Sequence, residues 1–331
     1  MTLGYNGRTM PHAADERQTA QLRELQALAA QPVEQRRLAL GLLVPTAGIR
    51  VVQAALKALA GTTEDAARPV LLRQYAHYAT DGVKRDPGTG LRVALLHILR
   101  PLAGYPDLPL LEAATMTYEF LPPTRSEAAH ELRAAALVIL HDQDAERAAF
   151  QAVRLLADEH TSRMSGEPAV TAVRILVAAG HLLPLYYYAT HTAVPVAEVL
   201  SDSLRALTGL PASLLPAIIE RYADTADEIV LAGLFDLLLG HATRAAHYPR
   251  VLAFLRTTQH YDVYRYLVTS IVADHKTALL PHLLDLAAAE RDPRRSRILL
   301  PALDLIGTDP AVAAVIAQLR SRVPPKRPGR L

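Results

Sequence analysis

Four prolines recur at a nearly constant interval in the second half of the chain, and this interval is the strongest constraint on the fold. They are Pro184, Pro216, Pro249 and Pro281, separated by 32, 33 and 32 residues. A period of this length is typical of helical repeats, in which no unit can bury its apolar face alone and successive units stack. We therefore expect the four prolines to occupy equivalent positions in the first turn of a helix, where the missing N–H sacrifices no hydrogen bond.

The last proline-marked unit, residues 279–307, shows the expected content of one repeat. Its first helix carries an apolar stripe of Leu279, Leu280, Leu283, Leu284 and Leu286. Pro293 breaks that pattern, and Asp292 can cap the helix that follows. The second helix carries Ile298, Leu299, Leu303 and Ile306 at helical spacing, and Gly307 ends it. One repeat is thus two short helices joined by a turn.

The same pattern extends over most of the chain. Four earlier pairs are predicted at Val33–Leu43 with Ala47–Ala60, Ala67–Ala79 with Gly90–Ala103, Leu108–Phe120 with Glu127–Leu140, and Ala145–Asp158 with Pro168–Ala179. An amphipathic helix over Ala13–Ala30 precedes them as a cap. We predict an all-α fold, a right-handed α-solenoid of about eight antiparallel helix pairs. Residues 13–322 form its single domain, between a flexible N-terminus (1–12) and a basic flexible tail (323–331).

Residues 279–307 resemble a HEAT-type repeat. The resemblance lies in the Leu-Leu-Pro first helix, the Asp-Pro turn, an early arginine (Arg297) and a Leu-x-x-Ile-Gly ending. Arginines at comparable places in other units are Arg50, Arg92, Arg133, Arg174 and Arg265. The resemblance covers most of residues 33–320, with a period shorter than the roughly 40–47 residues usual for the family, as in its short bacterial variety. It implies stacked helix pairs and a binding role.

Composition narrows the function classes. The net charge is only +2, so no overall field draws the chain to nucleic acid or to acidic membranes. The chain has no Cys, which excludes disulfides and thiolate catalysis. No run of 18 uncharged apolar residues occurs, and the N-terminus lacks the apolar core of a signal peptide. These features predict a soluble, cytoplasmic protein without a membrane partner.

The sequence offers no catalytic or metal-binding signature. We find no GxSxG, GxxxxGK[ST], GxGxxG after a strand, or HExxH motif. A histidine follows each of four predicted second helices: His141, His181, His241 and His275. They can be interpreted as metal ligands along one edge, or as side chains that interact with the C-terminal helix dipoles. Neighbouring helices pack about 8–10 Å apart, whereas every ligand atom of a zinc ion lies about 2 Å from the metal. Histidines at the ends of successive helices are therefore not expected to share one zinc ion. We expect neither metal nor cofactor, and the sequence favours a non-enzymatic role while leaving activity open.

Aromatic and basic side chains supply the candidate binding residues. Three consecutive tyrosines, Tyr186, Tyr187 and Tyr188, point about 100° apart on a helix, so at least one must face solvent or the next unit. The others are His247, Tyr248, Arg250, Tyr261 and Tyr264. Tyrosine is a frequent anchor at protein interfaces, although packing between repeats explains the same residues.

Two functions follow from these residues. The first is an interaction scaffold that binds a protein or peptide partner on its concave face. The alternative is binding of nucleic acid, in the manner of helical-repeat DNA glycosylases or through phosphate contacts from Arg244, Arg250 and Arg256. Because these three arginines are six residues apart, they do not form one helical stripe. The sequence therefore favours the protein or peptide partner.

Overall fold

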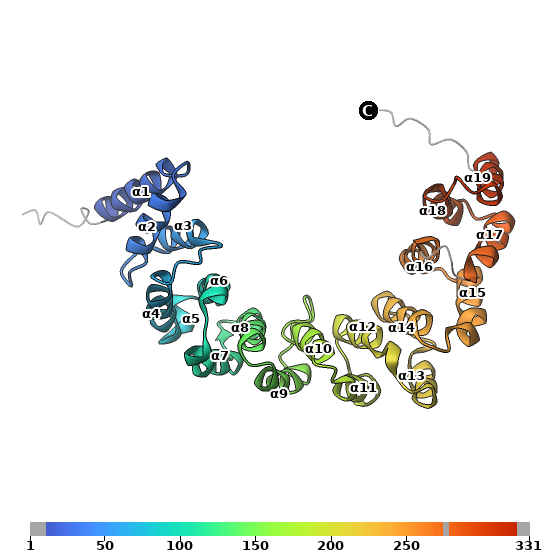
Figure 1. Ribbon diagram of the computed structural model, residues 1–331, viewed down its shortest axis with the longest axis horizontal. Helices are drawn as coiled ribbons and strands as arrows, with labels where there is room; N and C mark the ends of the chain where they lie inside the picture. The colour runs from blue at the N-terminus through green and yellow to red at the C-terminus, as the bar shows by residue number, and fades with distance from the viewer. Residues whose placement is uncertain (1–10, 274–277, 323–331) are drawn as a thin grey trace, which may run out of the picture. The chain divides into compact units, whose positions relative to one another are not determined.

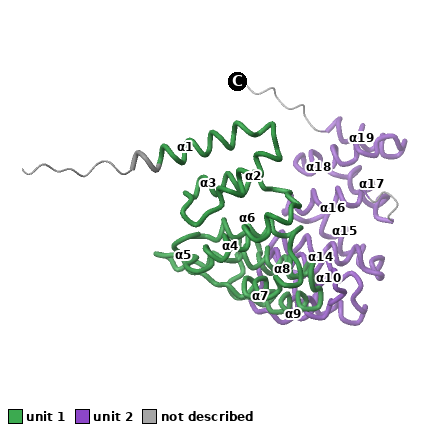
Figure 2. The backbone as a smooth tube through the Cα atoms, turned by 60° about the vertical axis from the view of Figure 1, so that its left-hand side comes forward, with its two compact units in different colours: residues 1–175 green, residues 176–331 purple. Residues whose placement is uncertain are grey.

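The computed structural model describes residues 11–273 and 278–322, and these ranges are predominantly helical (Figure 1). They hold nineteen α-helices, five short 3-10 helices and one hairpin of two-residue strands. The predicted all-α class is confirmed. The chain divides into two compact units, residues 1–175 and 176–331 (Figure 2). The single domain over residues 13–322 stays a prediction.

The first unit contains α1 to α9 and the hairpin. Its helices are α1 (Pro11–Ala27), α2 (Pro32–Leu42), α3 (Ile49–Leu59), α4 (Ala67–Ala79), α5 (Gly82–Arg85), α6 (Gly90–Leu99), η1 (Arg100–Leu102), η2 (Tyr105–Asp107), α7 (Leu108–Thr115), α8 (His130–Gln143) and α9 (Ala145–Leu156). Strands β1 (Phe120–Leu121) and β2 (Ser126–Glu127) pair antiparallel between α7 and α8. Helix α10 (Ala169–Ala178) begins in this unit and ends in the second.

The second unit is more regular. It contains α11 (Leu182–His191), α12 (Ala197–Ala206), η3 (Leu207–Gly209), η4 (Ala212–Leu214), α13 (Leu215–Tyr222), α14 (Glu228–Gly240), η5 (Arg244–His247), α15 (Tyr248–Thr257), α16 (Tyr261–Ala273), α17 (Leu279–Ala289), α18 (Pro293–Asp304) and α19 (Pro310–Arg322). We call α3, α6, α8, α10, α12, α14, α16 and α18 the second helices, because each is the second member of a predicted pair. In this unit α12, α14, α16 and α18 contact one another in succession.

The proline register is confirmed. Pro184 and Pro281 are the third residues of α11 and α17, and Pro216 and Pro249 are the second residues of α13 and α15. All four therefore lie in the first turn of a first helix, where their missing N–H breaks no helical hydrogen bond. The sequence analysis did not predict α19. This helix begins at Pro310, which is not one of the four repeat prolines.

Side chains of the following repeat satisfy the carbonyl groups that end the first helices. The pairs are Arg154 Nη2 to Thr115 O (2.6 Å), Arg221 Nη2 to Thr192 O (2.7 Å), Arg295 Nη1 to Arg256 O (2.7 Å) and Arg322 Nη1 to Ala288 O (2.7 Å). The last carbonyls of a helix have no intrahelical donor and need partners from elsewhere. At these four places the following repeat completes the helix end of the one before it.

The predicted helix Leu108–Phe120 is too long, and residues 116–127 form the hairpin instead. Helix α7 ends at Thr115, after which Thr117 Oγ1 donates to Ala113 O (3.0 Å). Arg133 Nη1 then donates to Thr117 O (2.9 Å), so the carbonyl that would continue the helix is held by a side chain. Threonine competes with the helical backbone in this way, and the apolar pattern alone does not reveal it.

The closest approach of two second helices, α12 and α14, depends on Gly233. A Cβ at this position would lie 2.6 Å from the Cα and 2.7 Å from the carbonyl oxygen of Ser201. We expect Gly233→Ala to lower the free energy of unfolding by about 1–3 kcal/mol, as overpacked sites do. Gly41→Ala is the matched control, because no atom lies within 4 Å of its added Cβ. Equal stability of both variants in thermal denaturation would contradict the close approach.

The described helices also bear on membrane association. None of them, over residues 11–273 and 278–322, combines the length and apolar character that crossing a bilayer requires.

Candidate functional site

A groove opens in the second unit between the second helices α16 and α18. Its volume is about 560 Å³, and we call it the α16–α18 groove. It is lined by Tyr261, Arg265, Thr269, Arg294, Arg297, Ile298, Pro301, Ala302 and Leu305. Leu305, which follows α18 directly, is 72% exposed, so a large apolar side chain faces solvent at one end of the groove.

The other end of the α16–α18 groove is basic and aromatic. The guanidinium of Arg294 lies 5.8 Å from the centre of the Tyr261 ring, so the N-terminal ends of α16 and α18 lie together. The Tyr261 hydroxyl lies 3.1 Å from Asp292 Oδ2, which fixes the ring at this end. None of the lining residues carries a carboxylate, whereas three of them carry guanidinium groups. The groove therefore presents an electropositive end and an apolar end.

Pro301 adds a backbone feature to the groove wall. It lies inside α18, and proline has no N–H to donate to the carbonyl four residues earlier. The carbonyl of Arg297 therefore lacks its usual α-helical partner. Since Arg297 and Pro301 both line the groove, this helical step lies on the groove side.

A second groove lies in the first unit, between the second helices α3 and α6. This α3–α6 groove has a volume of about 620 Å³. Its walls are mostly apolar: Ile49, Leu56, Ala60, Leu91, Ala94 and Ile98. Lys57, Arg85 and His97 also line it and are exposed, while the lining carboxylate Asp86 is buried. Asp86 accepts hydrogen bonds from Leu91 N (2.9 Å) and Arg92 Nε (3.1 Å), so it is already neutralised.

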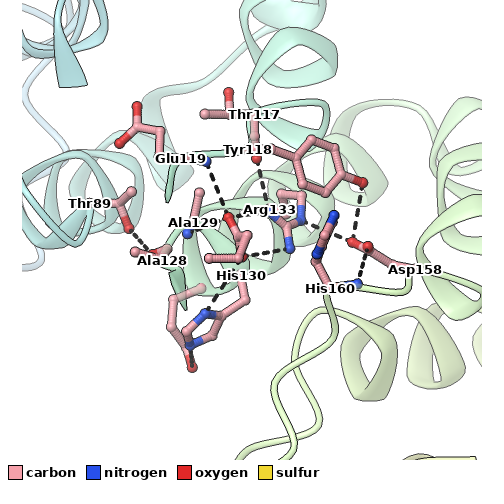
Figure 3. A network of polar contacts seen from close by, with 12 residues as sticks. Thr89, Thr117, Tyr118, Glu119, Ala128, Ala129, His130, Arg133, Asp158 and His160 are labelled. Carbon is pink, nitrogen blue, oxygen red and sulfur yellow. Dashed lines mark hydrogen bonds and ion pairs between the residues drawn. The ribbon is translucent and has the colours of Figure 1, made fainter. Parts of the chain in front are cut away.

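The hairpin of the first unit is held by a buried arginine, Arg133 (Figure 3). Arg133 is 0% exposed, and its Nη1 and Nη2 donate to the two carboxylate oxygens of Glu127 at 2.9 and 3.0 Å. Its Nε lies 3.2 Å from Asp158 Oδ2, and its guanidinium carbon lies 4.2 Å from the centre of the Tyr118 ring. A bidentate pair with a second carboxylate and an aromatic face satisfies most of this buried charge.

The electrostatics of the hairpin follow from this arrangement. Burial acts to raise the pKa of Glu127, but hydrogen bonds from Arg133 and from the Ala129 N–H outweigh it, and the pKa lies below its ordinary value. His160 packs edge-on against the rings of Tyr118 and Phe120, with centroids 5.6 and 5.2 Å apart. Every charged group at the centre of this network has a partner, so we interpret it as structural.

Two other second-helix arginines are buried in the same manner. Arg92 pairs with Glu119 (2.6 Å) and Asp86 (3.1 Å), and Arg295 donates to the carbonyls of Arg256 and Thr258. Arg295, rather than the Arg297 that carries the resemblance, is the buried arginine of α18. Arg50, Arg174, Arg265 and Arg297 are exposed. Arg92, Arg133 and Arg295 each have an acidic residue three to six positions upstream, but the exposed Arg265 and Arg297 have one too, so this spacing does not identify the buried arginines.

The three consecutive tyrosines divide as expected. Tyr187 is 63% exposed and stacks on His191 with ring centroids 4.5 Å apart, while Tyr186 is half-buried. Tyr188 is only 7% exposed, and its hydroxyl accepts from Val196 N (3.1 Å). Of the three tyrosines, Tyr187 is thus the exposed one.

The structure does not gather the remaining predicted residues into one site. Tyr261 lines the α16–α18 groove, whereas Tyr248 and Arg244 line a separate cavity of about 270 Å³ at the start of α15. Tyr264 is 0% exposed, and burial raises the pKa of its hydroxyl, which places the side chain in the core. The pKa of His247 is lowered, mainly by burial and to a smaller extent by the charges of His241 and Arg250.

The arginines and histidines of the other hypotheses are also dispersed. Arg250 and Arg256 are exposed on α15, and Arg244 is exposed in η5, outside both grooves. His141 and His241 lie at the C-terminal ends of α8 and α14, His181 precedes α11, and His275 is outside the described residues. Within those residues no three His, Asp or Glu side chains form a group that could hold a metal ion.

Comparisons with known proteins identify no relative, since no protein family, no curated protein and no solved structure matches the chain.

Proposed function

We propose that this protein is a non-enzymatic scaffold of HEAT-type helical repeats that binds a protein or peptide partner on the face formed by its second helices. The observation that carries the proposal is the recurrence of grooves between consecutive second helices, at α3–α6 and at α16–α18. Each groove lies within one unit. Each has the volume of a ligand site, in the range of about 300–1,000 Å³.

The repeat architecture supports this proposal. In the second unit the second helices contact one another in order, and the four repeat prolines all lie in the first turn of a first helix. We propose that the helices form a right-handed α-solenoid of eight pairs, in which the second helices line the concave face. Solenoids use such extended surfaces for binding.

The chemistry of the grooves favours a polypeptide as the partner. Each groove exposes aliphatic side chains, including Ile49 (53% exposed) and Leu305 (72% exposed). Apolar pockets beside charged rims recognise extended chains, in which apolar anchors alternate with polar groups. Nucleic acid would require several phosphates to be neutralised together. Arg244, Arg250 and Arg256, the arginines of that alternative, lie outside both grooves.

A display selection with a random peptide library against the full-length protein tests the proposal. We expect enriched peptides whose affinity falls about tenfold or more in Leu305→Asp, because burying a leucine contributes about 1.5–3 kcal/mol and tenfold corresponds to about 1.4 kcal/mol. Leu183→Asp is the matched control, since Leu183 is 77% exposed on the first helix α11, outside the groove.

Two results would contradict the proposal. One is a selection that enriches no peptide, and the other is equal loss of affinity in Leu305→Asp and Leu183→Asp. Salt-sensitive binding of a fluorescent oligonucleotide that disappears when Arg244, Arg250 and Arg256 are replaced by Ala would establish the nucleic-acid function instead.

A further inference from the structure

We infer that the α16–α18 groove selects acidic peptide segments in which a carboxylate precedes or follows an apolar side chain by about four to five positions. This inference rests on the proposed peptide-binding function and specifies its ligand. The carboxylate would pair with Arg294 and Arg297 at the N-terminal end of α18. The apolar side chain would pack between Ile298, Pro301 and Leu305.

The charges that line the α16–α18 groove favour an acidic ligand. The groove has three guanidinium groups and no lining carboxylate. Arg294 and Arg297 are three residues apart on α18, so they share one face of the helix. Both are exposed, and neither side chain forms an ion pair within the described ranges. An acidic ligand can therefore pair with these two arginines without breaking an existing ion pair.

The acidic residues nearest the groove are already engaged. Asp292 accepts from Arg294 N (2.8 Å) and from the Tyr261 hydroxyl (3.1 Å). Asp304 pairs with Arg320 (2.8 Å), away from the lining arginines. Asp262 pairs with Arg265 (3.3 Å), but both side chains are more than 60% exposed, and such surface pairs are weak and exchangeable. Among the described residues, Arg265 thus has a carboxylate partner, whereas Arg294 and Arg297 have none within ion-pair distance.

The length of the groove sets the spacing between the two groups of the ligand. Arg294 and Leu305 are eleven positions apart, which corresponds to about 16 Å along a helix at 1.5 Å per residue. An extended peptide covers about 3.3 Å per residue, so the two ends of the groove are about five peptide residues apart. The N-terminal ends of α16 and α18 also add positive partial charge at the arginine end. A carboxylate at one end and an aliphatic group at the other match both features.

The test compares an enriched peptide from the selection with the same peptide in which Asp and Glu are replaced by Asn and Gln. Using fluorescence anisotropy with the full chain, we expect the amide peptide to bind about tenfold more weakly, as charge-assisted hydrogen bonds to arginine predict. The variant Arg294→Gln/Arg297→Gln should bind the two peptides equally. The control Arg250→Gln changes an exposed arginine of α15 and should retain the difference.

Each contrary outcome has its own meaning. Enriched peptides that lack acidic residues, or acid and amide peptides that bind equally to the unmodified protein, would overturn the inference. They would leave the scaffold function in place, provided that Leu305→Asp still weakens binding. A failure to enrich any peptide would overturn both. Displacement of the peptide by a single-stranded oligonucleotide at moderate salt, with loss of that displacement in Arg294→Gln/Arg297→Gln, would assign the groove to phosphate and overturn the inference.

Discussion

Replacing Arg133 with methionine is expected to lower the free energy of unfolding by about 3–5 kcal/mol, because removing one partner of a buried ion pair leaves its carboxylates uncompensated. Arg133 is 0% exposed, and the side chains of Glu127 and Asp158 are only 6% and 2% exposed. Methionine fills the space of the aliphatic stem but supplies no charge. The chain has no Trp, so unfolding is best followed by far-ultraviolet circular dichroism.

The control for this variant is Arg147→Met. Arg147 also pairs with two carboxylates, Glu112 and Asp144, each at 3.2 Å, but its side chain is 47% exposed. Because water screens that pair, we expect no measurable loss of stability. Equal stability of Arg133→Met and Arg147→Met would show that the hairpin network contributes nothing to the fold.

The effect of Arg133→Met should also depend on pH. The pKa of Glu127 is lowered in the folded protein, so its contribution is present above its unfolded pKa and disappears as the pH falls through the folded value. In the variant, the same carboxylate loses its cation and gains stability by taking up a proton. The difference between variant and unmodified protein should therefore shrink in acid.

Leu299→Ala is expected to lower the free energy of unfolding by about 2–5 kcal/mol, the range for large-to-small changes in a packed core. Leu299 is 0% exposed on α18, and Leu283 is 0% exposed on α17, so Leu283→Ala should have a similar effect. Both belong to the apolar stripes that define the repeat. Denaturant unfolding measures the loss, with the two units of the chain analysed as separate transitions if they separate.

Leu305→Ala is the companion variant for Leu299→Ala. Leu305 is 72% exposed in the α16–α18 groove, so its truncation should leave stability almost unchanged and weaken peptide binding. Near-native stability of Leu299→Ala would mean that the buried stripe is assigned incorrectly. A large loss of stability in Leu305→Ala would mean that this side chain serves the core rather than a ligand.

The sequence predicted the helices well because each carries its own apolar period. The predicted Ala67–Ala79 agrees with α4 at both ends, and the repeat prolines lie where the period placed them. Tyr264 shows where sequence reasoning fails, because a tyrosine in a tyrosine-rich helix can face either the core or solvent. The partner of a buried arginine is similarly invisible, since Arg295 reaches the carbonyl of Arg256 through tertiary contact.

The candidate grooves were also beyond prediction, for a physical reason. A groove such as α16–α18 depends on how two helices one repeat apart come together, and its lining residues are separated by up to 44 positions in the chain. Spacing within one helix places Arg294, Arg297 and Pro301 near one another, but it does not reveal that Tyr261 completes the same wall. Only Tyr261 among the eight candidate binding residues belongs to it.

Side chains of a following repeat donate hydrogen bonds to carbonyl groups of the repeat before it, and these bonds determine where the chain can be shortened. A fragment that stops after α16 would keep the carbonyls of Arg256 and Thr258 but lose Arg295, their partner in α18. A fragment that stops after α17 would likewise leave the carbonyl of Ala288 without Arg322. Stable shortened versions of this protein should therefore end one repeat later than the last helix they are meant to preserve, or carry a substitute capping helix.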